Sequence, residues 1–279
     1  MPFLEANDCR FYYQQKGTGD DVVLVHAFTS STAIWLFTNT IEKLAKKYRV
    51  TAYDLRGHGS SAVTPTGYSS AEMVEDFFTI CERLDVGKCV VVGHSFGGVI
   101  GMHAAWSKPE SIRGVIFSDT YFPGLKSIEP DMGQAEPWAE LREQMMKCDI
   151  QLGATVDFAE LFEKVKAMTS DQKAILSRNM GAMSANWIAT LGRLAETNAG
   201  SAAFNEAGFG LEQIASINGP VLALYDEFSP FHQTREFLES HLKNIRSEII
   251  PKAKHLAPLQ NTHKFLKFVE EGIAEMTNP

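Results

Sequence analysis

Short apolar runs rich in β-branched and aromatic residues alternate with stretches of helical spacing, before residue 120 and again after residue 220. Runs of this length and composition predict strands, and strands that alternate with helices predict βαβ units in a parallel sheet. The predicted strands span residues 10–15, 22–26, 50–53, 89–92, 112–118, 221–225 and 246–250. The pattern therefore favours an α/β fold with a mostly parallel central sheet.

Helical spacing fills the intervals between these strands, so helices are expected to flank the sheet. The helices predicted in these intervals span residues 34–48, 69–84, 99–106, 234–242 and 265–276. Ser69 is followed three residues later by Glu72, a capping-box signature for the start of a helix.

No strand pattern occurs between about residues 122 and 214. Helical spacing dominates this part of the chain, at residues 138–148, 157–168, 171–183 and 186–196. A chain of 279 residues is long for one domain and short for two, which favours one large core with an insertion. We therefore expect a core of residues 1–122 and 215–279 and an inserted helical cap of residues 123–214.

The sharpest chemical signal is Ser95, in the sequence Gly93-His94-Ser95-Phe96-Gly97-Gly98. The G-x-S-x-G pattern lies between the predicted strand 89–92 and the predicted helix 99–106. A strand, a sharp turn and a helix form a nucleophile elbow, in which small neighbours let a strained turn present the serine hydroxyl. A glycine-rich turn with a structural serine is the alternative, but the context predicts a nucleophile.

Four motifs in order resemble the α/β-hydrolase fold family, in its serine hydrolase branch with a helical cap. They are His26-Ala27-Phe28, the loop 54–61, the elbow 93–98 and the segment 254–259. The resemblance covers residues 1–122 and 215–279 and implies a hydrolase with a catalytic triad and an oxyanion hole. The predicted cap matches no single subfamily.

A serine hydroxyl is a weak nucleophile at neutral pH and needs a base. His255 is the best candidate, because it follows the predicted strand 246–250 by a short loop and precedes the last helix. A late histidine also matches the chain order serine, acid, histidine that this fold uses. A surface histidine without a catalytic role is the alternative.

The triad acid is where the chain departs from the family pattern. Relatives tend to carry Gly-Glu-x-Asp-x-Pro after the strand that corresponds to 221–225, and here Ser229 occupies the aspartate position. Asp119 ends the strand 112–118, 24 residues after Ser95, and some relatives, among them a branch of the haloalkane dehalogenases, place the acid there. We favour Asp119 over Asp226 and then Glu227. A turn residue that opens the cap is the alternative for Asp119.

An oxyanion hole needs two backbone N–H groups aimed at the developing negative charge. The resemblance assigns them to Phe96, directly after the nucleophile, and Phe28. Ala27 stands where relatives usually have glycine, which restricts this loop. In the loop 54–61, Asp54 and Arg56 are expected to form an ion pair that braces the floor of the site.

The predicted cap is rich in methionine and aromatic residues, most of which are expected to form its own core. We expect substrate contacts from Tyr121, Phe122, Trp138 and Trp187. Such walls suit an ester, thioester or lactone with a sizeable apolar part. The competing functions are carbon–carbon bond hydrolysis with the same triad and ligand binding without turnover.

Composition narrows the partners. A net charge of −8 disfavours nucleic acid and anionic membranes, and no stretch approaches 18 apolar residues. The N-terminal residues lack a signal-peptide pattern, and the four cysteines lack disulfide-like spacing. We expect a cytoplasmic protein that acts on a small molecule without metal or cofactor, and a homodimer remains open.

Overall fold

The computed structural model describes residues 2–129, 136–180 and 184–278. Its strands form one eight-stranded sheet in the order β1-β2-β4-β3-β5-β6-β7-β8. The strands are β1 (Phe3–Ala6), β2 (Cys9–Lys16), β3 (Asp21–Val25), β4 (Arg49–Tyr53), β5 (Cys89–His94), β6 (Ile112–Ser118), β7 (Val221–Asp226) and β8 (Ile245–Ile250). In this order, every neighbouring pair from β4 to β8 is parallel, whereas β1 pairs antiparallel with β2 and β2 pairs antiparallel with β4. The predicted mostly parallel sheet is confirmed.

Strand β1 was missed by the sequence pattern. It pairs with β2 across a tight turn at Asn7 and Asp8, whose φ angles are 45° and 57°. Asn and Asp tolerate this left-handed region, which suits a two-residue hairpin turn. The short run at residues 3–6 becomes a strand because β2 supplies its hydrogen-bond partners.

The helices lie between the strands, mostly where the spacing predicts them. They are α1 (Ala33–Phe37), α2 (Thr40–Leu44), α3 (Ser70–Arg83), α4 (Phe96–Ser107), α5 (Glu136–Met146), α6 (Phe158–Ala167), α7 (Ser170–Met180), α8 (Ser184–Leu194), α9 (Ala199–Ala202), α10 (Leu211–Ala215), α11 (His232–His241), α12 (Ala257–Gln260) and α13 (Thr262–Thr277), with 3-10 turns η1 (Pro109–Ser111) and η2 (Pro123–Leu125). The capping box of Ser69 and Glu72 is confirmed. The single helix predicted over residues 34–48 is wrong, because Asn39 adopts φ 55° and separates α1 from α2.

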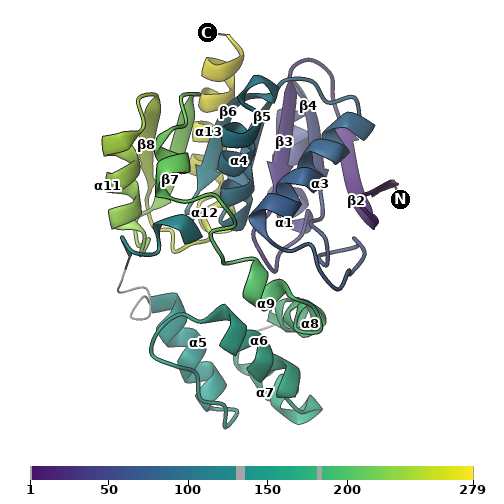
Figure 1. Ribbon diagram of the computed structural model, residues 1–279, viewed down its shortest axis with the longest axis vertical. Coiled ribbons are helices and arrows are strands. Elements are labelled where there is room, and N and C mark those ends of the chain that lie inside the picture. The colour runs from purple at the N-terminus through teal and green to yellow at the C-terminus, as the bar shows by residue number, and fades with distance from the viewer. Residues whose placement is uncertain (1, 130–135, 181–183, 279) are drawn as a thin grey trace.

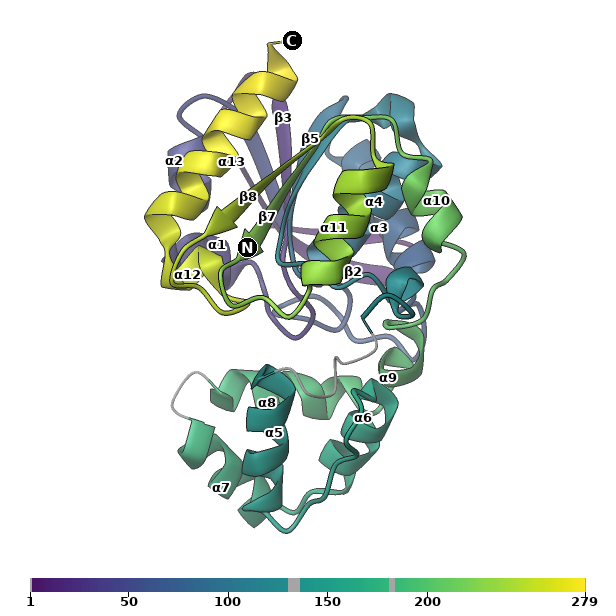
Figure 2. The same cartoon turned by 90° about the vertical axis from the view of Figure 1, so that its left-hand side faces the viewer.

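Helices cover both faces of the sheet. In Figure 2, α1, α2, α12 and α13 lie on one side, and α3, α4, α10 and α11 lie on the other. Successive strand residues point to opposite faces, so Leu24 packs into the core that contains Trp35 and Phe265, whereas Val25 packs into the core that contains Ile100. Strands buried on both faces explain the continuous apolar runs in the sequence.

Helices α5 to α9 lie together below the edge of the sheet where the parallel strands end (Figure 1). The chain leaves the sheet after β6 and returns before β7, and the two connecting segments touch. A Cβ on Gly124 would lie 2.3 Å from the carbonyl oxygen of Phe209, so this crossing requires glycine. The division into core and cap at residues 122 and 215 stays a prediction. The last residues of the helix predicted at 171–183 lie outside the described residues.

The strand order contains a topological switch point between β3 and β5. From the neighbouring strands β3 and β5 the chain proceeds outward in opposite directions, to β4 and to β6. The loops that follow β3 and β5 therefore diverge at the carboxyl ends of the strands, where open α/β sheets bind their ligands. Phe28 follows β3 and Ser95 follows β5, so both candidate residues lie at this switch point.

Candidate active site

Ser95 forms a strained turn between β5 and α4. Its φ of 51° and ψ of −118° are unusual for a residue with a side chain. A Cβ on Gly97 would lie 2.1 Å from the carbonyl oxygen of Val25, so only glycine lets the turn approach β3 this closely. The Ser95 amide donates to the carbonyl of Ser118 at 2.8 Å, and the Thr120 hydroxyl donates to the carbonyl of Ser95 at 2.9 Å. The end of β6 thus fixes the turn.

Asp119 and His255 meet at the same edge of the sheet. Nδ1 of His255 donates to Oδ2 of Asp119 at 2.7 Å. The Asp119 carboxylate is fully buried, whereas 32% of the His255 side chain is exposed. The Asp119 amide donates to the carbonyl of Leu224 at 2.8 Å, which ties the carboxylate to β7. The structure therefore brings together the acid and the histidine that the sequence favours.

The charge around His255 suits a base. Burial lowers the pKa of His255, but the hydrogen bond and charge of Asp119, with the charge of Asp226, outweigh it and raise that pKa above 6.5. Because Nδ1 donates to Asp119, Nε2 is the nitrogen that can accept a proton. Ser95 and His255, both within the described residues, share no hydrogen bond. Such contacts are often long until substrate is bound.

His94 holds the backbone of His255. Nε2 of His94 donates to the carbonyl oxygen of His255 at 2.7 Å. Burial first, and then the charge of His255, lower the pKa of His94 to about 4, so this side chain is neutral at pH 7. His94 lies inside the elbow motif, but the sequence contained no signal for its contact with a residue 161 positions away.

The other two candidate acids, Asp226 and Glu227, which the structure describes, accept hydrogen bonds from backbone amides and make no hydrogen bond to the His255 ring. Oδ2 of Asp226 accepts from the amide of Ala257 at 3.1 Å, and a Glu227 carboxylate oxygen accepts from the amide of Lys252 at 2.7 Å. The Ser229 hydroxyl oxygen accepts from a backbone amide on its own turn at 3.1 Å. Among the described residues, Asp119 is the carboxylate that hydrogen-bonds the His255 ring.

The side chains of the two residues predicted to supply the oxyanion donors are neighbours, because the Phe28 and Phe96 ring centroids lie 5.3 Å apart. Neither amide donates to a protein acceptor within the described part of the chain. Nδ1 of His26 donates to the carbonyl oxygen of Ala27 at 2.8 Å. Thr29 adopts φ 66°, a strained conformation for a β-branched residue. Sequence reasoning missed Thr29, because no local pattern marks its left-handed backbone.

An aromatic cluster, consisting of Phe28, Phe96, Phe158, Phe162 and Phe204, joins the elbow to the helices below it. The Phe204 ring lies 5.2 Å from the Phe28 ring and 5.8 Å from the Phe96 ring, and it stacks on Phe158. Phe162 approaches Phe28 at 6.1 Å. The residues predicted to supply the oxyanion donors therefore belong to a cluster of aromatic rings.

The four predicted substrate contacts occupy different surroundings. Tyr121 is half-buried, 5.9 Å from the Phe231 ring, which lies 5.9 Å from His255. Phe122 is fully buried against a β6 side chain. Trp138 packs near the aromatic cluster, with its ring 6.3 Å from Phe158. Trp187 is half-buried on α8. Their substrate contacts stay predictions.

The ion pair expected between Asp54 and Arg56 is wrong. Arg56 pairs instead with Asp76, which accepts from Nε and Nη2 at 2.6 Å each. Asp54 instead accepts from the amides of Thr32 and Ser60, at 2.7 and 2.8 Å. A planar guanidinium pairs best with a carboxylate that can be approached in its own plane, which α3 supplies from outside the loop.

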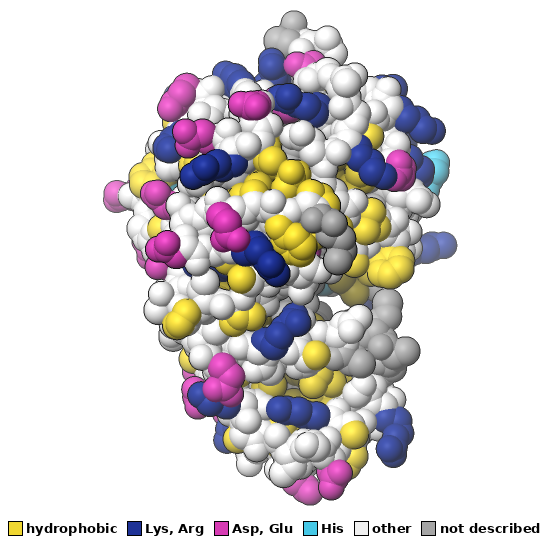
Figure 3. Space-filling model, turned by 90° about the vertical axis from the view of Figure 1, so that its right-hand side faces the viewer, with side chains coloured by type: hydrophobic (Ala, Val, Ile, Leu, Met, Phe, Trp, Pro, Cys, Tyr) yellow, Lys and Arg dark blue, Asp and Glu magenta, His cyan; other side chains and the backbone are white. Residues whose placement is uncertain are grey.

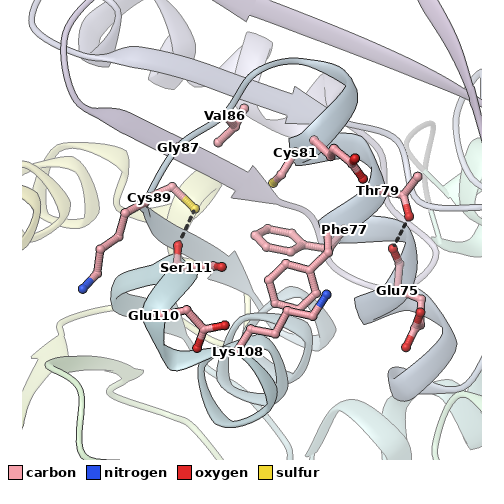
Figure 4. Close-up of a pocket in the computed structure, with 13 residues that line it drawn as sticks. Glu75, Phe77, Thr79, Cys81, Val86, Gly87, Cys89, Lys108, Glu110 and Ser111 are labelled. Atoms are coloured by element: carbon pink, nitrogen blue, oxygen red, sulfur yellow. Dashed lines mark hydrogen bonds between the residues drawn. The ribbon is translucent and has the colours of Figure 1, made fainter.

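A pocket of about 430 Å³ lies away from this site (Figure 4). Phe77, Cys81, Cys89 and Lys108 are among its lining residues. Cys89 begins β5 and Ser95 follows its end, so the pocket and the elbow lie at opposite ends of the strand. The pocket contains none of the predicted site residues.

The described residues contain no group of three or more side chains suited to hold a metal ion. No described helix has the length and apolar character needed to cross a bilayer. On the face in Figure 3, basic and acidic side chains are interspersed, without a continuous basic surface.

Comparisons with known proteins agree with the fold. The family model described as alpha/beta hydrolase fold matches residues 21–262. The chain is 26% identical to the "Putative 2-succinyl-6-hydroxy-2,4-cyclohexadiene-1-carboxylate synthase" of Bacillus subtilis, covering 91% of this chain and 90% of that protein. It is 25% identical to the pimeloyl-[acyl-carrier protein] methyl ester esterase of Aeromonas hydrophila, covering 92% and 96%. The enol-lactonase of Burkholderia xenovorans, 18% identical, superposes with a TM-score of 0.70 over 98% of this chain and 100% of that chain, which shows the shared fold.

Proposed function

Because this chain belongs to the alpha/beta hydrolase fold family and is a hydrolase of that fold, we propose that it cleaves a carboxylic ester, thioester or lactone through an acyl-enzyme on Ser95. The observation that carries the proposal is the hydrogen bond between Asp119 and His255, at the sheet edge where the strained Ser95 turn lies. A nucleophile, a base and a group that orients the base are the parts such a reaction needs.

In the proposed acylation step, Oγ of Ser95 attacks the substrate carbonyl carbon and its proton passes to Nε2 of His255. The charged imidazole is stabilised by the buried carboxylate of Asp119. The negative charge on the carbonyl oxygen is held by the amides of Phe28 and Phe96, each worth roughly 10²–10³ in rate. His255 then protonates the leaving alcohol or thiol as its bond to the carbonyl carbon breaks.

Deacylation uses the same groups with water as the nucleophile. His255 removes a proton from water, the resulting hydroxyl oxygen bonds to the acyl carbon, and the bond to Ser95 breaks as its oxygen regains a proton. A lactone follows the same steps, except that its leaving oxygen stays attached to the acyl group.

The aromatic cluster supports an apolar substrate. Phe28 and Phe96 present both the proposed oxyanion donors and two of the rings that meet Phe204. An acyl or alcohol portion near the reacting carbon would therefore contact aromatic rings, which bury apolar groups well. One similar full-length protein is named as an esterase and another as a synthase, so the substrate needs a direct test.

Labelling with a fluorophosphonate, followed by hydrolysis of p-nitrophenyl esters of increasing chain length, tests the proposal. Labelling that Ser95→Ala abolishes, with faster cleavage of hexanoate than acetate, is expected. A preference for acetate contradicts the apolar substrate. Labelling without ester, thioester or lactone turnover favours carbon–carbon bond cleavage. No labelling of the folded protein contradicts the serine mechanism and favours ligand binding without turnover.

A further inference from the structure

Asp226 occupies the end of β7, beside the proposed acid and the loop that carries His255. Its amide donates to Oδ1 of Asp119 at 3.2 Å, and its Oδ2 accepts from the amide of Ala257 at 3.1 Å. Asp119 in turn accepts from the His255 ring at 2.7 Å. These three hydrogen bonds, together with the short stretch of chain from His255 to Ala257, form a closed cycle of contacts that begins and ends at Asp226. This cycle holds the imidazole through Asp119 and the backbone of its loop through Asp226.

The loop that carries His255 needs such an anchor. His255 adopts φ 60° and Lys252 adopts φ 59°, a left-handed conformation that residues with side chains rarely take. Such a conformation is strained and persists only when neighbouring contacts hold it. His94 holds the carbonyl oxygen of His255, and Asp226 holds the amide two residues later.

The second oxygen of Asp226 lacks a hydrogen-bond partner in the described part of the chain. The residue is fully buried, and its Oδ1 has no hydrogen-bond partner among the described residues. An unpartnered, buried carboxylate oxygen disfavours the charged form. A residue needed only to accept from Ala257 could be an asparagine, so a carboxyl at this position points to an electrostatic role as well.

We propose that Asp226 is a positioning residue that fixes the loop bearing His255 and, as a second carboxylate behind Asp119, controls the charge state of that histidine. The proposal rests on the proposed function, in which His255 is the base. It differs from the assignment of Asp226 as the triad acid, because its carboxylate contacts the backbone of the histidine loop instead of the ring.

The charges near Asp226 support this role. Burial, together with the charge of Asp119, raises the pKa of Asp226 to about 7, and the charge of His255 and the amides of Leu256 and Ala257 oppose that rise. The charge of Asp226 in turn contributes to the raised pKa of His255. The groups that face Asp226 are thus Asp119, which follows β6, and His255 from its loop, and the charges of Asp226 and His255 each affect the pKa of the other.

The test compares Asp226→Asn with Glu227→Gln. Asparagine keeps an acceptor for the Ala257 amide but removes the charge, so the His255 pKa is expected to fall. ¹⁵N-histidine NMR titration reads that pKa directly and needs no turnover. In Asp226→Asn we expect the His255 pKa to shift downward by at least about 0.3 pKa units. The acid limb of the kcat/KM profile is expected to move by the same amount, and kcat is expected to fall less than about 30-fold. Glu227→Gln removes a carboxylate of the same turn and is expected to shift neither.

Three outcomes overturn the proposal. An unchanged His255 titration in folded Asp226→Asn reduces Asp226 to a structural residue. A kcat loss near 10⁴-fold in Asp226→Asn makes Asp226 the triad acid. An equal shift in Glu227→Gln removes the specificity of the effect. If the wild-type protein cleaves no ester while the NMR shift occurs, the proposed function fails and the coupling between Asp226 and His255 stands.

Discussion

The carboxylate of Asp119 lies 2.7 Å from Nδ1 of His255, although 136 residues separate them in the chain. The acid comes from the end of β6 and the histidine from the loop after β8. Strand β7 lies between these two strands, and its last residue, Asp226, donates its amide to Asp119. The pair therefore depends on the sheet order, which places the ends of β6, β7 and β8 side by side.

Asp119→Asn tests the proposed acid. Asparagine fits the site but cannot stabilise a charged imidazole, so kcat is expected to fall by roughly 10⁴-fold with the fold retained. Ester hydrolysis and circular dichroism measure the two properties. Asp226→Asn is the matched variant and is expected to lose far less activity. If Asp119→Asn keeps more than a tenth of the wild-type kcat, Asp119 is not the acid.

The pH dependence of kcat/KM follows from His255. The imidazole must be neutral to accept a proton, so activity is lost as the pH falls through its pKa. Burial lowers this pKa, but Asp119 and Asp226 outweigh burial and raise it above 6.5. Activity on a neutral ester is therefore expected to decline already above pH 6.5. A rate that stays constant down to pH 5.5 contradicts this electrostatic account.

Stability should respond to the charge of Asp226. Burial first, and then the charge of Asp119, raise its pKa from 3.8 to about 7. A raised pKa means that the folded state prefers the neutral carboxyl, so this contribution to stability is present below pH 3.8 and lost as the pH rises through 7. Asp226→Asn stays neutral, and its Tm relative to wild type is expected to increase by several degrees from pH 5 to pH 8.

Thermal unfolding at three pH values measures this trend. Glu227→Gln supplies the comparison, because its exposed carboxylate accepts from the Lys252 amide at the surface. If the Tm difference between Asp226→Asn and wild type does not change with pH, ionisation of the buried carboxyl does not destabilise the fold.

Arg56 and Asp76 form a buried ion pair, with Arg56 side-chain exposure of 7% and Asp76 exposure of 3%. Arg56→Ala leaves a buried carboxylate without its partner and is expected to destabilise the fold by about 3–5 kcal/mol. Urea unfolding measures the loss. The exposed pair of Lys147 and Glu143 is the control, and Lys147→Ala is expected to leave stability unchanged. Equal effects of both variants contradict the importance of burial.

Phe204 tests the aromatic cluster. Removing its ring takes apolar surface away from Phe28 and Phe96, so Phe204→Ala is expected to raise KM for a hexanoyl ester by roughly tenfold, with a smaller change for acetate. Phe209→Ala is the control, because Phe209 stacks on His103 on α4 and lies outside the cluster. Equal KM changes for the two esters would remove Phe204 from the substrate site.

Much of the fold could be predicted from the sequence because the patterns that indicate its strands and helices are local. The continuous apolar runs predict strands buried on both faces, and Ser69 with Glu72 predicts the start of α3. The errors occurred where backbone geometry overrides composition. Asn39 adopts a left-handed conformation and divides a helical pattern into α1 and α2. Four residues at the N-terminal end become β1 because they pair with β2.

The sequence by itself determined the Ser95 turn and the place of His255. Glycines flank the serine where no Cβ fits, and the histidine loop follows the last strand. Only the tertiary structure decided which carboxylate meets His255, which residue pairs with Arg56, and which rings approach Phe28. Hydrogen bonds and ring contacts act over a few ångströms, so they depend on how distant strand ends and helices pack in space. No local pattern in the chain encodes those distances.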